Sequence, residues 1–300
     1  MNWTDSTSYG ETYYMILNGK GLKVWAITLI LPAIFFIATT YIMVMLIIEM
    51  CSTGIGLREA KSVGERFGAW MKIMRLLLAT VSNISYLDCW LIRLLVDLYY
   101  PEYCQVYKLY RIGSFSITIV LSYLAMWLRH RVIYSNPSMS HLTNPITRTI
   151  SVIVVVLSVL LPTSNAVLSI ATFHSEVTEG GCMVVSSTIP TKTPWIIISM
   201  SSTILQLMIL GLFIHPLRQH QIVIGRAADN LTPVLRKAFY TSLVCCLSDT
   251  AASVVAATIG GTFLPLAVTM SSFANLTMIV VSFAEWQKTI FPCIRSGNIS

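Results

Sequence analysis

Seven long apolar segments dominate the sequence and constrain its fold more than any other feature. They cover residues 22–49, 71–98, 104–129, 148–172, 195–216, 235–260 and 264–284. A helix that spans the hydrocarbon core of a bilayer needs about 20 mostly apolar residues. Each segment reaches that length, although the second and third contain internal charges. The pattern predicts an all-α membrane protein, a seven-helix transmembrane bundle.

The composition supports a membrane protein. Apolar residues make up 55% of the 300 residues and charged residues only 11%, whereas a soluble domain carries roughly 25% charged residues. The net charge of +7 is better explained by basic loops on the inner membrane face than by nucleic-acid binding. No basic run with interleaved aromatic residues occurs, so no nucleic-acid partner is expected.

Lysine and arginine fall unevenly on the two ends of the predicted helices. With the N-terminus outside, fourteen lie at inner ends, at positions 58, 61, 66, 72, 75, 129, 131, 148, 218, 226, 236, 237, 288 and 295. Five lie at outer ends, at positions 20, 23, 108, 111 and 192, and Arg93 remains within the membrane. This asymmetry predicts an outer N-terminus. Residues 1–21 would then be an extracellular tail with a glycosylation site at Asn2, residues 22–284 the transmembrane domain, and residues 285–300 an amphipathic helix with a short cytoplasmic tail.

Two of the seven cysteines are placed to meet on the outer side. Cys104 opens the third segment, and Cys182 lies in the loop 173–194. The secretory route is oxidising, so a disulfide between them would tie this loop over the mouth of the bundle. The alternative is two free thiols.

At these residues the chain resembles the rhodopsin-like (class A) G-protein-coupled receptors. In that family a cysteine at the top of the third helix pairs with the second outer loop. The arginine of an Asp/Glu-Arg-Tyr motif follows twenty-five residues later. Counting from Cys104 gives Arg129, in the sequence Leu128-Arg129-His130. Asn275 stands where the family has Asn-Pro-x-x-Tyr, without the proline. The resemblance implies a multi-pass plasma-membrane receptor that binds an extracellular small molecule or peptide and activates a heterotrimeric G protein.

The resemblance also implies roles for basic residues at the inner helix ends. Contact with the G protein would involve Arg129, His130, Arg131, Arg236, Lys237 and Asn275. Leu128 stands where the family has its acid, so appreciable basal activity is expected unless Asp229 or Glu285 supplies the acidic partner of Arg129. In the final helix, Trp286, Ile290 and Phe291 would dip into lipid while Lys288 and Arg295 face phosphates, and Cys293 is a candidate for palmitoylation. The alternative for the arginines is a lipid-headgroup anchor.

Ionisable residues within the predicted spans are candidates for ligand binding. The candidate pocket consists of Asp88, Arg93, Arg111 and Phe115. Arg111 lies where aminergic receptors of the family carry an aspartate, so it would repel an amine and attract a carboxylate, phosphate or sulfate. The alternative is internal pairing, either Arg93 with Asp97 at i+4 or Arg111 with Asp88.

A polar cluster is also expected near the membrane midplane. Asp249 would meet Ser82, Asn83 or Asn275 there. Ser82 stands where the second helix of the family carries an aspartate, and that aspartate takes part in sodium binding. A simple hydrogen bond between helices is the alternative.

Other functional classes fit the sequence less well. It contains no HExxH, GxSxG or phosphate-binding loop, so no enzyme, metal site or cofactor is expected. A retinal protein needs a lysine in the middle of a span, and the seventh segment has none. A transporter that passes its substrate along intramembrane charges is the main alternative, although no matching interrupted helices in two halves indicate one.

Overall fold

The computed structural model describes residues 22–54, 63–134, 145–178, 181–190, 193–224, 232–259, 264–282 and Ile290. Its α-helices are α2 (Leu22–Thr53), α3 (Val63–Leu87), α4 (Arg93–Leu98), α5 (Cys104–Tyr134), α6 (Pro145–Thr172), α7 (Thr193–Ile224), α8 (Thr232–Ile259) and α9 (Leu264–Val281). The π-helix η1 (Asp88–Ile92) joins α3 to α4 without a break, and the 3-10 helix η2 (Pro101–Tyr103) precedes α5. Each predicted apolar segment lies largely within this helical structure.

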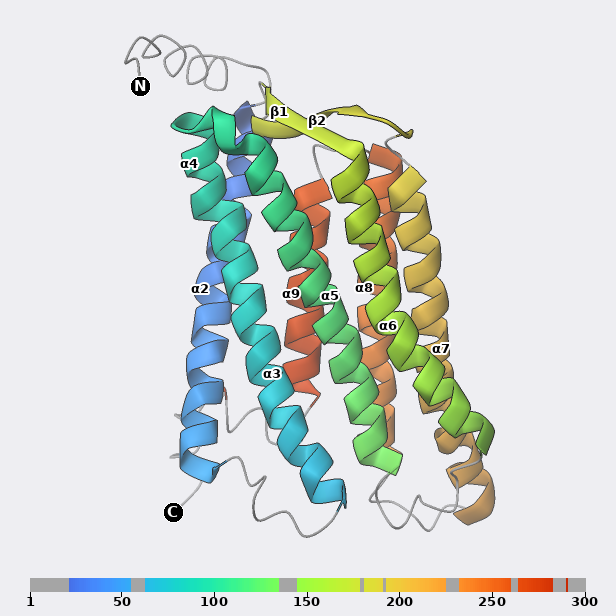
Figure 1. Ribbon diagram of the computed structural model, residues 1–300. Coiled ribbons are helices and arrows are strands. Elements are labelled where there is room, and N and C mark those ends of the chain that lie inside the picture. Colours follow the sequence, from blue (N-terminus) through green and yellow to red (C-terminus); the bar gives the residue numbers. More distant parts are fainter. Residues whose placement is uncertain are drawn as a thin grey trace, which may run out of the picture.

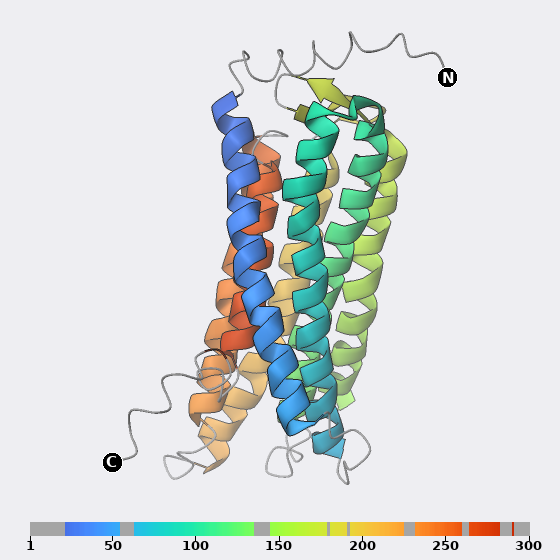
Figure 2. The same cartoon turned by 90° about the vertical axis from the view of Figure 1, so that its left-hand side faces the viewer.

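The helices form one closed bundle and run side by side along a common axis (Figures 1 and 2). α3 packs against α2 and α5, and each later helix up to α9 packs against its neighbours in the chain. α9 also packs against α2, α3 and α5, which closes the ring. α5 runs along the bundle from one end to the other (Figure 1).

The face of the bundle that points outward is strongly apolar. On α2, the side chains of Ile27, Ile30, Ile34 and Ile37 are all more than half exposed, whereas Thr39 on the same helix is buried. A soluble protein seldom exposes so large a contiguous apolar surface. The arrangement suits a bundle surrounded by lipid.

Three helices of the described chain are long and apolar enough to cross a membrane. They are Trp25–Thr53, Pro101–Val132 and Pro145–Thr172. Shorter apolar stretches occur in the later helices, at Ser199–Leu212, Phe239–Val255 and Leu266–Val281. The structure thus supports a helical membrane protein.

The loop between α6 and α7 contains two strands that the all-α prediction did not include. β1 (Phe173–Thr178) and β2 (Gly181–Ser187) form an antiparallel pair, which lies across one end of the bundle (Figure 1). In β1, Phe173 and Ser175 are buried whereas His174 and Glu176 are exposed, the alternation of a strand with one covered face. We call this end of the bundle the hairpin end.

The core near the opposite end includes a residue that was predicted to contact lipid. Ile290 is 8% exposed and packs with Leu46, Leu78 and Leu276. Its backbone oxygen also accepts a hydrogen bond from the Tyr41 hydroxyl at 2.6 Å. The predicted lipid contact of Ile290 is therefore wrong, because the side chain fills a gap between helices of the bundle.

Candidate functional site

The hairpin is fastened to the bundle by a disulfide between Cys104 and Cys182. Cys104 is the first residue of α5, and Cys182 lies in β2. Gln105 adds two hydrogen bonds to β1, since its side chain donates to the Phe173 carbonyl at 3.3 Å and accepts from the Ser175 N–H at 2.8 Å. The predicted disulfide is present, and it holds the hairpin over the start of α5.

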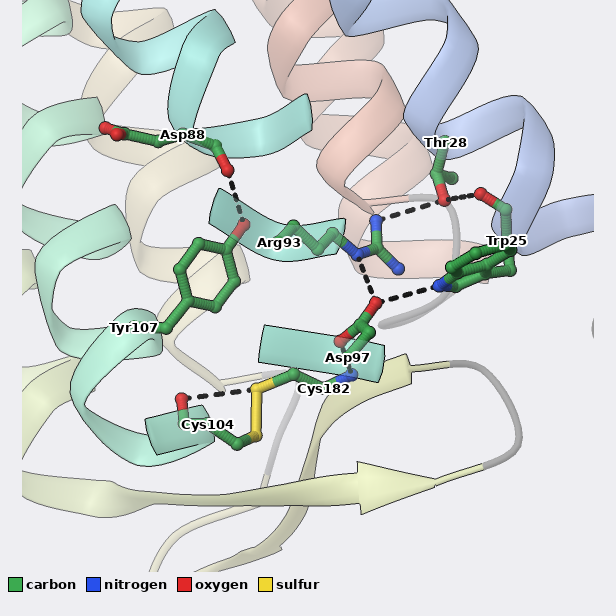
Figure 3. Close-up of polar contacts among 8 residues, drawn as sticks. All are labelled: Trp25, Thr28, Asp88, Arg93, Asp97, Cys104, Tyr107 and Cys182. Atoms are coloured by element: carbon green, nitrogen blue, oxygen red, sulfur yellow. Dashed lines mark hydrogen bonds and ion pairs between the residues drawn. A yellow bond between two sulfur atoms is a disulfide. The ribbon is translucent and has the colours of Figure 1, made fainter. Parts of the chain in front are cut away.

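Asp97 connects the same hairpin to two further helices (Figure 3). Its side chain is 0% exposed. One carboxylate oxygen accepts from the Cys182 backbone N–H at 2.7 Å. The other accepts from Trp25 Nε1 of α2 at 2.8 Å and from Arg93 Nε at 3.3 Å. Three donors from three elements thus converge on one buried carboxylate.

Arg93 completes this network, which we call the Asp97 network: Trp25, Thr28, Arg93, Asp97 and Cys182. The Arg93 guanidinium donates to Thr28 Oγ1 at 3.0 Å, and Thr28 in turn donates to the Trp25 carbonyl at 2.8 Å. Arg93 is 4% exposed and pairs with Asp97 one helical turn away. The structure therefore contains the internal i+4 ion pair between Arg93 and Asp97, which was the alternative to a ligand-binding role for Arg93.

The other candidates for the ligand pocket lie on η1 and α5. Arg111 and Phe115 are half-buried on α5. Asp88 opens the π-helix η1 and is 2% exposed. Asp88 and Arg111 interact electrostatically, but the described residues contain no ion pair between them. In Figure 3 the contact of Asp88 is made by its backbone carbonyl, which accepts a hydrogen bond from the Tyr107 hydroxyl at 3.3 Å.

Asp249 of α8 is the centre of a second polar cluster, which joins four helices. Its carboxylate accepts from Gln206 of α7 at 2.6 Å and from Asn275 of α9 at 2.7 Å. Ser271 of α9 also donates to it, and the Tyr123 hydroxyl of α5 lies 3.4 Å away. The predicted contact between Asp249 and Asn275 is confirmed.

Ser82 forms no hydrogen bond with Asp249, so that part of the prediction is wrong, and Asn83, one of the alternatives, has its partners elsewhere. The Asn83 amide donates to Thr39 at 3.1 Å and to Thr40 at 2.7 Å, and thereby joins α3 to α2. The Ser82 hydroxyl is fully buried and has no hydrogen-bond partner in the described part of the chain. The reason is that α3 packs against α2, α5 and α9 and makes no comparable contact with α8, which carries Asp249.

Most of the predicted coupling residues lie at the end opposite the hairpin. Arg129 donates to the Ser282 carbonyl at 3.4 Å and interacts electrostatically with Lys237. His130 is 3% exposed and packs on Tyr134, with 4.4 Å between ring centroids. Arg131 lies over the Trp127 ring, 5.6 Å from its centroid. Arg236 is exposed, so this end presents a mixture of buried and accessible cations.

Several predicted residues lie outside the described part of the chain. They are Asn2, Asp229, Glu285, Trp286, Lys288, Phe291, Cys293 and Arg295. Within the described residues, no group of three His, Cys, Asp or Glu side chains is placed to hold a metal ion.

Three partners in these clusters were not predicted: Trp25, Gln206 and the backbone N–H of Cys182. Trp25 lies near the start of one apolar segment and Gln206 within another. A polar group within a membrane must find a hydrogen-bond partner, so the sequence indicates that both side chains form a hydrogen bond but does not identify the partner. The N–H of Cys182 carried no signal, since any backbone amide could serve.

Comparison with known proteins adds no identification. The sequence matches no protein-family model and no curated protein. The class that the fold defines is a helical bundle suited to a membrane, and its function rests on the geometry above.

Proposed function

We propose that this chain is a cell-surface receptor of the class A type, which binds a small extracellular ligand and activates a heterotrimeric G protein. In this proposal all seven helical segments span the plasma membrane, with the hairpin end outside. The single observation that carries it is the placement of two features on α5. The helix bears the hairpin disulfide at its first residue, Cys104, and Arg129 near its other end.

The length of α5 between these two residues suits a membrane span. Twenty-five residues separate Cys104 from Arg129, or roughly 37 Å at about 1.5 Å per residue. A bilayer is about 30 Å thick in its hydrocarbon core and about 40–45 Å with its headgroups. Both residues would therefore lie in or near the headgroup layers, on opposite sides.

Two independent features support an outer hairpin end. Disulfides persist in oxidising compartments, and the Cys104–Cys182 bond belongs to this end. The Lys and Arg count assigns the same end to the outside. α2 begins there as well, because Trp25 contacts Asp97 beside the hairpin, so the N-terminus would be extracellular.

The polar contacts within the bundle support a signalling role. Asp249 links α7, α8 and α9, and Tyr123 brings α5 close to the same carboxylate. A shared buried carboxylate favours one relative placement of these helices over others. A ligand that binds one placement better would shift the population between bundle states, and a G protein would read the change at Arg129.

The direct test is ligand-free nucleotide exchange on a panel of Gα subunits in membranes, with wild type compared with Arg129→Ala. Arg148→Ala is the matched control, because Arg148 is an exposed cation near the start of α6. The expected result is basal exchange on at least one Gα that is lost in Arg129→Ala and kept in the control. Equal exchange in all three proteins would remove Arg129 from the mechanism. No exchange by a surface-expressed wild type would favour a transporter.

A further inference from the structure

A pair of basic residues on α5 lies just inside the hairpin end. Lys108 and Arg111 are three residues apart, so their side chains project from the same side of the helix on successive turns. They lie about 6 Å and about 10 Å along the axis from Cys104, at about 1.5 Å per residue. Both are half-buried, so each retains access to solvent or to a small ligand.

The charges near this pair do not balance. Lys108 interacts electrostatically with Arg111, Arg93 and Asp97, and Arg111 with Asp88. By formal charge, the local set contains three basic residues (Arg93, Lys108, Arg111) and two acidic residues (Asp88, Asp97), an excess of one basic residue. Like charges at this depth repel each other because little water screens them.

The donors that surround Asp97 make this carboxylate poorly placed to neutralise the pair. Asp97 already accepts from Trp25, Arg93 and the Cys182 N–H. Neither Lys108 nor Arg111 forms an ion pair with a carboxylate among the described residues. A ligand that brings a negative charge would relieve the repulsion and complete the balance.

The chemistry of the two side chains indicates which anion fits. A guanidinium presents a planar fork that matches a carboxylate, phosphate or sulfate through two parallel hydrogen bonds. A lysine ammonium adds a compact point charge with three donors. An amine ligand is excluded on the same grounds, since it would add a fourth positive charge to the set.

We propose that Lys108 and Arg111 bind the oxyanion group of a small extracellular ligand, a carboxylate, phosphate or sulfate. The inference rests on the proposed receptor function only for the outer orientation of the hairpin end. It differs from the prediction made from the sequence, because Lys108 takes the place of Arg93. The Asp97 network holds Arg93 as a structural residue.

Anion binding is tested on the purified full-length protein in nanodiscs of phosphatidylcholine. The melting temperature is measured against increasing phosphate, sulfate or succinate, with chloride at matched ionic strength. The variants are Lys108→Gln and Arg111→Gln, and Lys23→Gln is the control because Lys23 is an exposed lysine near the same end. We expect stabilisation by at least one oxyanion in wild type and Lys23→Gln, with apparent affinity at least tenfold weaker in the other two variants.

Two further arms keep the result decisive. If a Gln variant fails to fold, Lys108→Arg and Arg111→Lys replace it. The first should retain binding, and the second should weaken it several-fold because the fork is lost. Nanodiscs that contain phosphatidylglycerol identify the source of the anion: stabilisation by this lipid that needs Lys108 and Arg111 would indicate a lipid headgroup.

The proposal is overturned if oxyanions stabilise wild type no more than chloride and anionic lipid has no effect that depends on the pair. It is also overturned if Lys108→Gln and Arg111→Gln respond like Lys23→Gln. No G protein takes part in the assay, so a failed exchange experiment and a failed binding experiment remain distinguishable.

Discussion

Substitution of Asp97 by asparagine should strongly destabilise the protein at the hairpin end. The carboxylate is 0% exposed and accepts from Trp25, Arg93 and the Cys182 N–H. An asparagine amide has one acceptor oxygen and one donor nitrogen. If the oxygen keeps the Cys182 N–H, the amide nitrogen faces two other donors and the Arg93 charge loses its partner.

The magnitude follows from the buried charge. Removal of one member of a buried ion pair costs about 3–5 kcal/mol, mostly because the remaining charge is uncompensated. At about 2–4 °C per kcal/mol for a large domain, the melting temperature should fall by roughly 6–20 °C. Replacement of both charges, in Arg93→Leu/Asp97→Leu, removes the unpaired cation and should recover a substantial part of that loss.

The assay is thermal unfolding of the purified protein in nanodiscs, followed by tryptophan fluorescence. Glu102→Gln is the control, because Glu102 is an exposed carboxylate near the same end. It should melt within about 2 °C of wild type, since surface charges contribute about 0–1 kcal/mol. The reasoning is refuted if Asp97→Asn melts like Glu102→Gln, or if the double variant is less stable than Asp97→Asn.

Four other substitutions test the remaining contacts by the same melting assay. Cys182→Ser and Cys104→Ser should each cost about 2–5 kcal/mol through loss of the disulfide, and a double variant that is far less stable than either would contradict a shared bond. Asn83→Ala removes the hydrogen bonds from α3 to α2 and should cost about 1–3 kcal/mol; an unchanged melting temperature would show that these bonds contribute nothing net. Asp249→Asn should cost about 1–3 kcal/mol, because an amide nitrogen replaces an oxygen that accepts from donors, and a more stable variant would contradict the donor assignment.

Hydropathy was sufficient to predict the helices, for a simple physical reason. A span requires a long apolar run, so the segments 104–129 and 148–172 fall within α5 (Cys104–Tyr134) and α6 (Pro145–Thr172). The extra turns at the helix ends are more polar and escape a hydropathy criterion. The β1–β2 hairpin was missed because it is short and its formation depends on partners from α5.

Side-chain partners were easiest to predict where one helix fixes both of them, whereas of the partners expected for Asp249 on other helices only Asn275 is found. The pair Arg93 and Asp97 is local, and its i+4 spacing sets the distance before any packing is known. Ser82 was expected near Asp249, although their placement depends on which helices are neighbours, and the structure puts α2 beside that part of α3.

The Asp97 network and the basic pair on α5 together indicate how one end of the bundle divides structural and binding roles among its charges. Asp97 forms its ion pair with Arg93 and fixes the hairpin through the backbone of Cys182, so it interacts with Lys108 only at longer range. The excess positive charge therefore remains beneath a hairpin that the disulfide holds in place. If Asp97 paired with Lys108 instead, Arg93 would lose its carboxylate and the excess of one formal positive charge would remain, so the Arg93–Asp97 pair decides which cations are left for the proposed anion, and these are Lys108 and Arg111.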